Sequence, residues 1–316
     1  MRWIGDRFGR RLPKAGDFGG PKLLHAGHFV GKGYQPGNPY LHSFREQIRL
    51  GVMPIGGRAK KRNFSVDLHG EDAEKAIKLL SSLSRNQYEK NVPRVVFGAF
   101  DAVIGGLLED GSAIFEVVSV EDRLALLDIP VTGLLTVAGR VFQRVPRGVT
   151  RSGWYGFRSC SHAKVFSFKI PNELGGSYAY KNMISRFSKL NLNLPSFIVL
   201  EPGKRNDTGF DYEEFSRLQY VASEKLISDL GWGGLGLSES YTTEYFRVDV
   251  RVSQHLVQAV LRARLESDFN ANFKRVGLDA VLKISGLPTP DEIRSVSAAL
   301  REGRMSFEEA LEKISL

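Results

Sequence analysis

Apolar residues recur at helical spacing through most of the chain after residue 70. Ala76, Leu79, Leu80 and Leu83 form one such stripe, which predicts a helix beginning near Glu71. The same spacing, with Pro and Gly near the expected ends, predicts the remaining helices. Their ranges are 40–51, 95–108, 177–190, 212–230, 245–276, 291–302 and 306–314.

Runs rich in β-branched and aromatic residues lie between these helices and predict strands. The expected strands cover residues 113–120, 134–145, 153–158, 164–170, 196–201 and 280–284. Helices and strands occur in separate runs rather than in strict alternation, which is typical of an α+β protein. We therefore expect an α+β fold in which a mixed sheet is accompanied by long helices.

The first 63 residues have a different composition from the rest. They are rich in Gly, Pro, Arg and Lys and show no periodicity except in the short helix near 40–51. We interpret them as an extended basic arm that becomes ordered on a partner surface. The expected division is an arm at 1–63, an α+β region at 64–174, helices with a short hairpin at 175–236, and a long helix with an α/β segment at 237–316.

Charge separates the same regions. Residues 1–63 contain 13 Lys/Arg and 3 Asp/Glu, whereas the remaining residues contain 31 and 32. A basic arm suits a polyanion such as nucleic acid, through phosphate neutralisation and counterion release. A solubilising tail, or an arm that wraps an acidic face of a neighbouring subunit, explains the charge equally well.

Clusters of Lys and Arg give the candidate nucleic-acid contacts. A solvated linker or helix surface is the alternative for each cluster. The candidates are Arg58, Lys60, Lys61, Arg62, Lys181, Arg186, Lys189, Lys204 and Arg205.

Motifs for catalysis are weak or incomplete, so the sequence predicts no enzyme, no cofactor and no metal site. The glycine-rich run 231–236 follows a helix rather than a strand, which favours a helix C-cap and hinge over a dinucleotide site. Cys160 and His162 lack a third orienting group, which favours a buried structural cysteine. His25 and His28 have no neighbouring third ligand. A single cysteine excludes an internal disulfide, and no apolar run is long enough to span a bilayer.

The order of these segments resembles the core of tailed-phage portal proteins. A small, glycine-bearing helix leads into a strand with the pattern G-x-A-x-x-E, here Gly111 to Glu116. The segment 162–176 then leads into a helix, as in that family, and the helix at 212–230 resembles the family's stem helix. The resemblance covers roughly residues 45–316. The chain is short for a portal, so we expect the distal crown to be absent or reduced.

Several functional expectations are implied by this resemblance alone. Portal proteins form a ring, commonly of twelve subunits, at one capsid vertex, and double-stranded DNA passes through it during packaging and ejection. The implied partners are capsid protein, a connector or adaptor, and terminase. The implied location is the virion, after assembly in the host cytoplasm. The alternatives are another virion assembly protein, such as a capsid or connector component, and a general nucleic-acid-binding protein.

Overall fold

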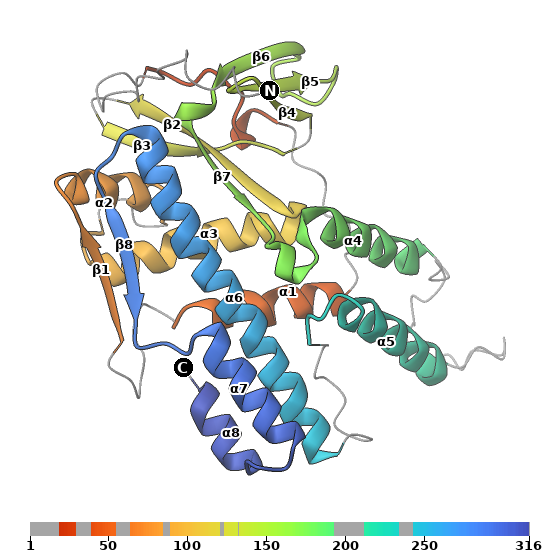
Figure 1. Ribbon diagram of the computed structural model, residues 1–316. Coiled ribbons are helices and arrows are strands. Elements are labelled where there is room, and N and C mark those ends of the chain that lie inside the picture. The colour runs from red at the N-terminus through yellow and green to blue at the C-terminus, as the bar shows by residue number, and fades with distance from the viewer. Residues whose placement is uncertain are drawn as a thin grey trace, which may run out of the picture.

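The computed structural model describes residues 19–29, 39–54, 64–84, 89–120, 123–131, 133–192, 212–233 and 243–315. These residues form an α+β fold, as predicted (Figure 1). Its helices are α1 (Pro39–Val52), α2 (Ala73–Ser81), α3 (Val92–Asp110), α4 (Gly176–Leu192), α5 (Tyr212–Ser228), α6 (Glu244–Val276), α7 (Pro290–Arg301) and α8 (Phe307–Ile314). Its strands are β1 (Ser65–His69), β2 (Ser112–Val120), β3 (Arg123–Asp128), β4 (Leu134–Val137), β5 (Arg140–Val145), β6 (Gly156–Ser161), β7 (Val165–Lys169) and β8 (Val281–Ser285). Three short 3-10 helices are η1 (Ala26–His28), η3 (His162–Lys164) and η4 (Asn172–Leu174).

The strands form three small antiparallel sheets rather than the expected mixed sheet. Their orders are β1-β8, β3-β2-β7 and β4-β5-β6. The links β2–β3, β4–β5 and β5–β6 are short, and short links join antiparallel neighbours because parallel pairing needs a long crossover. The expectation of a mixed sheet was therefore wrong.

The expected strand 134–145 is in fact a hairpin of β4 and β5. Its two-residue turn is Ala138 and Gly139, with φ of 48° and 73°. Two consecutive positive φ values are typical of the type I′ turn, whose twist matches that of the flanking strands. Alanine seldom adopts this conformation, so the sequence carries a weak turn signal here. The strand expected at 153–158 begins later, as β6, and β1 and β3 were not expected.

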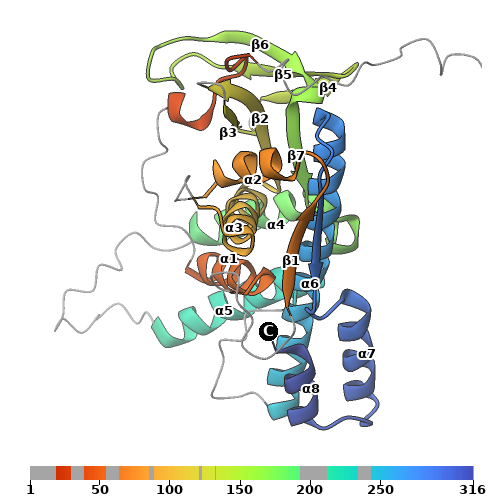
Figure 2. The same ribbon diagram turned by 90° about the vertical axis from the view of Figure 1, so that its left-hand side faces the viewer.

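The apolar core surrounds α3, which is nearly enclosed by α1, α2, β2, β7 and α6 (Figure 2). Phe100 of α3 stacks on Phe269 of α6, with ring centroids 5.3 Å apart. Phe166 and Phe168 of β7 extend this aromatic group. Burying large aromatic rings in contact with one another supplies much of a core's stability, so this group joins the helical and β parts of the fold.

Helix α1, within the region expected to be an arm, packs into this core. Phe44, Ile48 and Val52 are buried along one face. On the partly exposed face the Arg49 guanidinium contacts the Asp101 carboxylate of α3 at 2.6 Å. Spacings of four residues place the three apolar side chains on one side of the helix, which explains why α1 belongs to the body of the protein.

Helices α4 and α5 lie beside each other and extend away from the body (Figure 1). Gly231, with φ of 73°, ends the segment after α5, which confirms the predicted C-cap. The next residue, Trp232, is fully buried between Phe44 and Tyr180. Its indole N–H donates to the carbonyl oxygen of Leu174 at 3.1 Å. The base of this helix pair is therefore anchored in the core.

Helices α7 and α8 pack against the first half of α6. Val248 and Val252 of α6, with Ile293 and Val296 of α7, form a second apolar cluster. Both α7 and α8 begin with a capping box. In the described part of the chain, no helix combines the length and the hydropathy that crossing a bilayer requires.

Candidate nucleic-acid and assembly surfaces

The cysteine and the histidine pair that the sequence analysis considered as chemical groups lie among the described residues. Cys160 is buried in an apolar cluster, as predicted, and burial raises the pKa of its thiol to about 12. No group of three or more His, Cys, Asp or Glu side chains among the described residues could hold a metal ion. The rings of His25 and His28 contact each other, with centroids 3.9 Å apart. No third described His, Cys, Asp or Glu side chain completes a metal-binding group with them.

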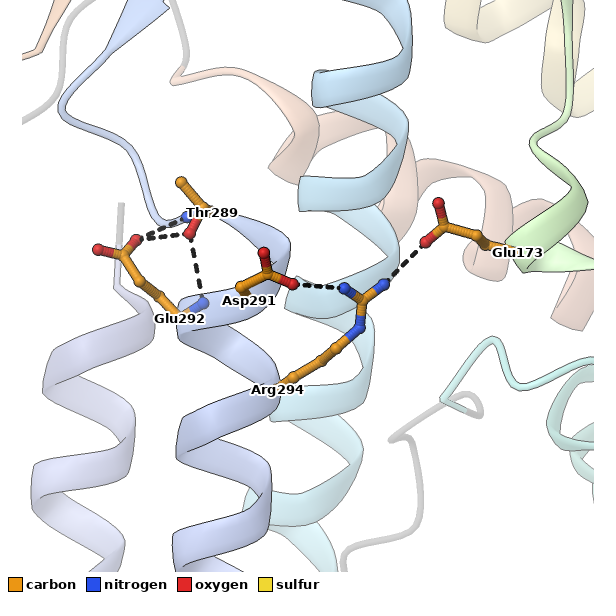
Figure 3. Close-up of polar contacts among 5 residues, drawn as sticks. All are labelled: Glu173, Thr289, Asp291, Glu292 and Arg294. Atoms are coloured by element: carbon orange, nitrogen blue, oxygen red, sulfur yellow. Dashed lines mark hydrogen bonds and ion pairs between the residues drawn. The ribbon is translucent and has the colours of Figure 1, made fainter.

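Three carboxylates lie near the start of α7, and each is already bonded within the chain (Figure 3). Glu292 turns back to accept from the backbone N–H of Thr289, which completes the helix cap. Asp291 and Glu173 both contact the guanidinium of Arg294, each at 2.7 Å. These carboxylates are occupied by a cap and an ion pair, and they tie α7 to η4 rather than forming a cation site.

A segment of the chain's own N-terminal region lies between the two three-stranded sheets. This segment comprises residues 19–29, and we call it the strap. The strap crosses the inner side of the β4-β5-β6 sheet, where Leu23 packs against Val141 and Cys160. Its first residue accepts a backbone hydrogen bond from Ser119, and its last forms an isolated bridge with Thr150. The strap thus fixes the N-terminal region onto the sheets.

Two buried polar side chains hold the strap by its backbone. The carboxylate of Glu116 accepts the N–H groups of Lys22 and Leu23, both at 2.9 Å. The side chain of Gln143 accepts the N–H of Leu24 at 2.7 Å and donates to its carbonyl at 2.8 Å. Burial raises the pKa of Glu116, although the strap's N–H donors oppose that shift. Without the strap these two buried side chains would lose their partners, which is costly.

Contacts in the structure explain each of the three fixed residues in the sequence pattern G-x-A-x-x-E. Gly111 has φ of 71° and makes the turn between α3 and β2, where Ser177 donates to its carbonyl at 2.5 Å. Ala113 lies so close to Gly106 of α3 that a Cβ on that glycine would sit 3.0 Å from it. Glu116 holds the strap. Each position therefore has a structural reason.

The predicted nucleic-acid contacts are only partly within the described residues. Lys181, Arg186 and Lys189 are exposed on α4, and helical geometry spreads them over a broad side of it. Lys181 lines a shallow hollow together with Glu109 and Asp110, so carboxylates offset part of its charge. The others, namely Arg58, Lys60, Lys61, Arg62, Lys204 and Arg205, lie outside the described residues, as does the strand expected at 196–201. The structure therefore places only the three residues of α4, and the predicted set as a whole stays a prediction.

A basic region that sequence analysis missed covers the β4-β5-β6 sheet. Residues 129–172 contain no Asp or Glu and seven Lys/Arg, a run visible in the sequence but hidden when charge is summed over the whole body. Five of them are arginines within or beside the sheet, namely Arg140, Arg144, Arg147, Arg151 and Arg158. None of the five belongs to an ion pair found among the described residues. A search for local stretches free of acidic residues would have found them.

Comparison with solved structures gives a distant likeness. No protein-family model and no curated protein matches this chain. A solved structure, described as an HK97 family phage portal protein from Corynebacterium diphtheriae, is similar at 13% sequence identity and a TM-score of 0.29. The alignment covers 85% of this chain and 95% of that chain. A TM-score of this size supports no conclusion about fold or function.

Proposed function

We propose that this chain is a structural, ring-forming protein of the tailed-phage portal type. In this role it forms a channel for double-stranded DNA during packaging and ejection and attaches the tail at a capsid vertex. Its partners would be capsid protein, a connector or adaptor, and terminase, which supplies the ATP hydrolysis. The observation that carries the proposal is the exposed apolar surface of the projecting helix pair.

This surface lies on the part of the protein expected to act as a stem. Leu218 and Val221 are three residues apart on α5, so they share one face, and they are 53% and 50% exposed. Tyr178, near the start of α4, is 87% exposed. Exposed apolar side chains on a projecting element are typical of an interaction surface. Packing of the same helices from neighbouring copies would cover them, which is what a ring with a central stem requires.

The order of elements in the structure agrees with the order on which the resemblance to portal proteins rests. The structure shows the same elements in the same order: α3, the turn at Gly111, β2 with Glu116, the segment from β7 to α4, and then α5. The body also needs no catalytic group for a mechanical role. The second candidate function is a general nucleic-acid-binding protein, favoured by the arginine-rich region at 129–172.

Mass and shape of the assembly test this proposal. Native mass spectrometry and negative-stain microscopy of the purified full chain should show a tapered ring of about a dozen copies with a central channel. A monomer or dimer that persists across concentration and salt would refute the ring and favour the second candidate.

A pair of substitutions tests the surface itself. Leu218→Glu with Val221→Glu should break the assembly into small species, because two buried charges at each contact would lack partners. Leu50→Glu is the matched control, since Leu50 of α1 is 52% exposed but lies outside the helix pair. Assemblies of unchanged mass from both variants would mean that α5 does not form the contact.

A further inference from the structure

The outward side of the β4-β5-β6 sheet presents an ordered array of apolar and basic side chains. Strand register places Leu135 of β4, Phe142 of β5 and Ser159 of β6 in one row. In the next row Arg144 of β5 lies opposite Phe157 of β6. Because alternate residues of a strand share a face, the rings of Phe142 and Phe157 belong to the same side of the sheet, as diagonal neighbours.

This outward side is open among the described elements. Phe157 is 74% exposed and Leu135 is 61% exposed. The other side of the sheet is the one covered by the strap, where Val141 and Gln143 of β5 are buried. Figure 2 shows the sheet at the top of the molecule with the remaining elements below it. The exposed side chains of Phe157 and Leu135 therefore belong to a face that no described element covers.

Arginines surround these rings. On β5, Arg140 and Arg144 lie on either side of Phe142 in the same alternation. Arg140 donates to the hydroxyl of Ser159 at 2.9 Å, which directs its guanidinium across the face. Beyond the end of β5, the Arg147 guanidinium lies 4.4 Å from the ring centroid of Tyr155, which is 51% exposed. Residues 129–172 contain no Asp or Glu, so the charged side chains that this stretch contributes to the face are all basic.

We propose that this outward face binds single-stranded nucleic acid. Arg140 and Arg144 would contact phosphates, while unpaired bases would stack on Phe157 and Tyr155. Aromatic rings beside cationic groups on an open surface are the combination that binds single strands without reading sequence. A duplex keeps its bases stacked inside, so it could use the arginines but not the rings. The proposal does not depend on ring formation by the protein.

Charge complementarity favours this occupant over a protein partner. Arg140 and Arg144 lie on this face, they belong to no ion pair among the described residues, and residues 129–172 contain no Asp or Glu. Protein interfaces depend on local pairing of opposite charges, whereas a phosphate backbone presents only negative charge. The exposed rings then account for the preference for unpaired bases.

Fluorescence anisotropy of a labelled oligothymidylate of about 20 nucleotides tests the rings, with the intact chain as the binding protein. Phe157→Ala should weaken binding roughly 5- to 150-fold, the range that loss of one stacking ring implies. Phe246→Ala is the matched control, because Phe246 is a partly exposed ring at the start of α6, outside the sheet and the helix pair, and it should leave the affinity unchanged. Equal affinities for wild type and Phe157→Ala would overturn the proposal, since the basic arm would then account for binding.

The salt dependence tests the arginines. The double variant Arg140→Gln, Arg144→Gln should reduce the slope of log affinity against log salt by roughly 1.4, the value for two phosphate contacts on a single strand. Arg123→Gln with Arg247→Gln removes the same charge from exposed positions elsewhere and should reduce the slope by less. Equal slopes for the two double variants would overturn the assignment to this face.

A duplex competitor and the mass of the assembly complete the test. The single strand should bind more tightly than a duplex of equal length, and Phe157→Ala should remove most of that difference. A duplex that binds as tightly as the single strand would overturn the proposal that unpaired bases stack on the rings of this face. A variant that changes the assembly mass while keeping its oligonucleotide affinity would instead identify the face as a protein interface.

Discussion

The substitution Gln143→Leu should release the strap from the sheets. Gln143 is fully buried and forms both of its described hydrogen bonds with the backbone of Leu24, at 2.7 and 2.8 Å. Leucine has a similar volume but no polar atoms, so the N–H and carbonyl of Leu24 would each lose a partner inside the protein. An unpaired buried polar group costs about 1–3 kcal/mol, which gives a total of about 2–6 kcal/mol if the strap stays in place.

The strap can avoid this cost by detaching, so the observable effect is local opening. Cleavage by trypsin after Lys22 requires the strap to leave the sheet, because Leu23 and Leu24 on the cleaved side are buried. A loss of about 2 kcal/mol should raise the rate of this cleavage roughly 30-fold when opening is fast relative to cleavage. Limited proteolysis followed by mass spectrometry measures the rate at this one site, and hydrogen exchange at Leu23 and Leu24 provides a second measurement.

Thr136→Ala is the control, since Thr136 is exposed on the neighbouring strand β4 and contributes nothing to the strap's described hydrogen bonds. It should leave both the cleavage and the exchange rates unchanged. An unchanged cleavage rate in Gln143→Leu, with the global stability also unchanged, would refute the reasoning that these two hydrogen bonds hold the strap.

Three further predictions concern buried groups. Burial, with the charges of Arg262 and Arg251, lowers the pKa of His255 from 6.5 to about 4. The unfolded chain therefore binds more protons between these two pH values, so the free energy of unfolding should fall as pH drops from 6.5 toward 4, by at most about 3 kcal/mol. Urea titrations at several pH values should show a smaller dependence of this free energy on pH for His255→Gln than for wild type. The Cys160 thiol, with its pKa raised to about 12, should react with a thiol reagent at pH 8 about three orders of magnitude more slowly in the folded than in the unfolded protein; equal rates would contradict its burial. Tyr180→Phe removes a hydrogen bond of 2.6 Å to the carbonyl of Leu108 and should cost about 0.5–1.5 kcal/mol in urea unfolding, without changing the assembly mass.

Helices with strong periodicity or clear end signals could be predicted from the sequence. Thr289 and Glu292, or Ser306 and Glu309, form a capping box because a hydroxyl and a carboxyl three residues apart reach the free N–H groups of the first turn. These contacts are local, so the sequence contains all the information they need. The long helix α6 and the class of the fold were predicted for the same reason.

Features that depend on distant partners could not be predicted. The pairing of β1 with β8 joins residues more than 200 positions apart, and a five-residue strand gives little signal alone. The hairpin of β4 and β5 depends on an alanine in a conformation that tertiary context imposes. The candidate site shows the same limit, because the face formed by Phe142, Phe157 and Arg144 exists only once strand register is known.

Helix α6 has a mechanical consequence for any assembly that contains this chain. Its 33 residues include neither Pro nor Gly, so it spans about 50 Å without a natural point of bending. Phe269 and Phe273 fix one end in the main core, while Val248 and Val252 fix the other against α7 and α8. A push on the α7–α8 end would therefore travel along a stiff rod to β7 and the sheets, rather than dissipating in a hinge.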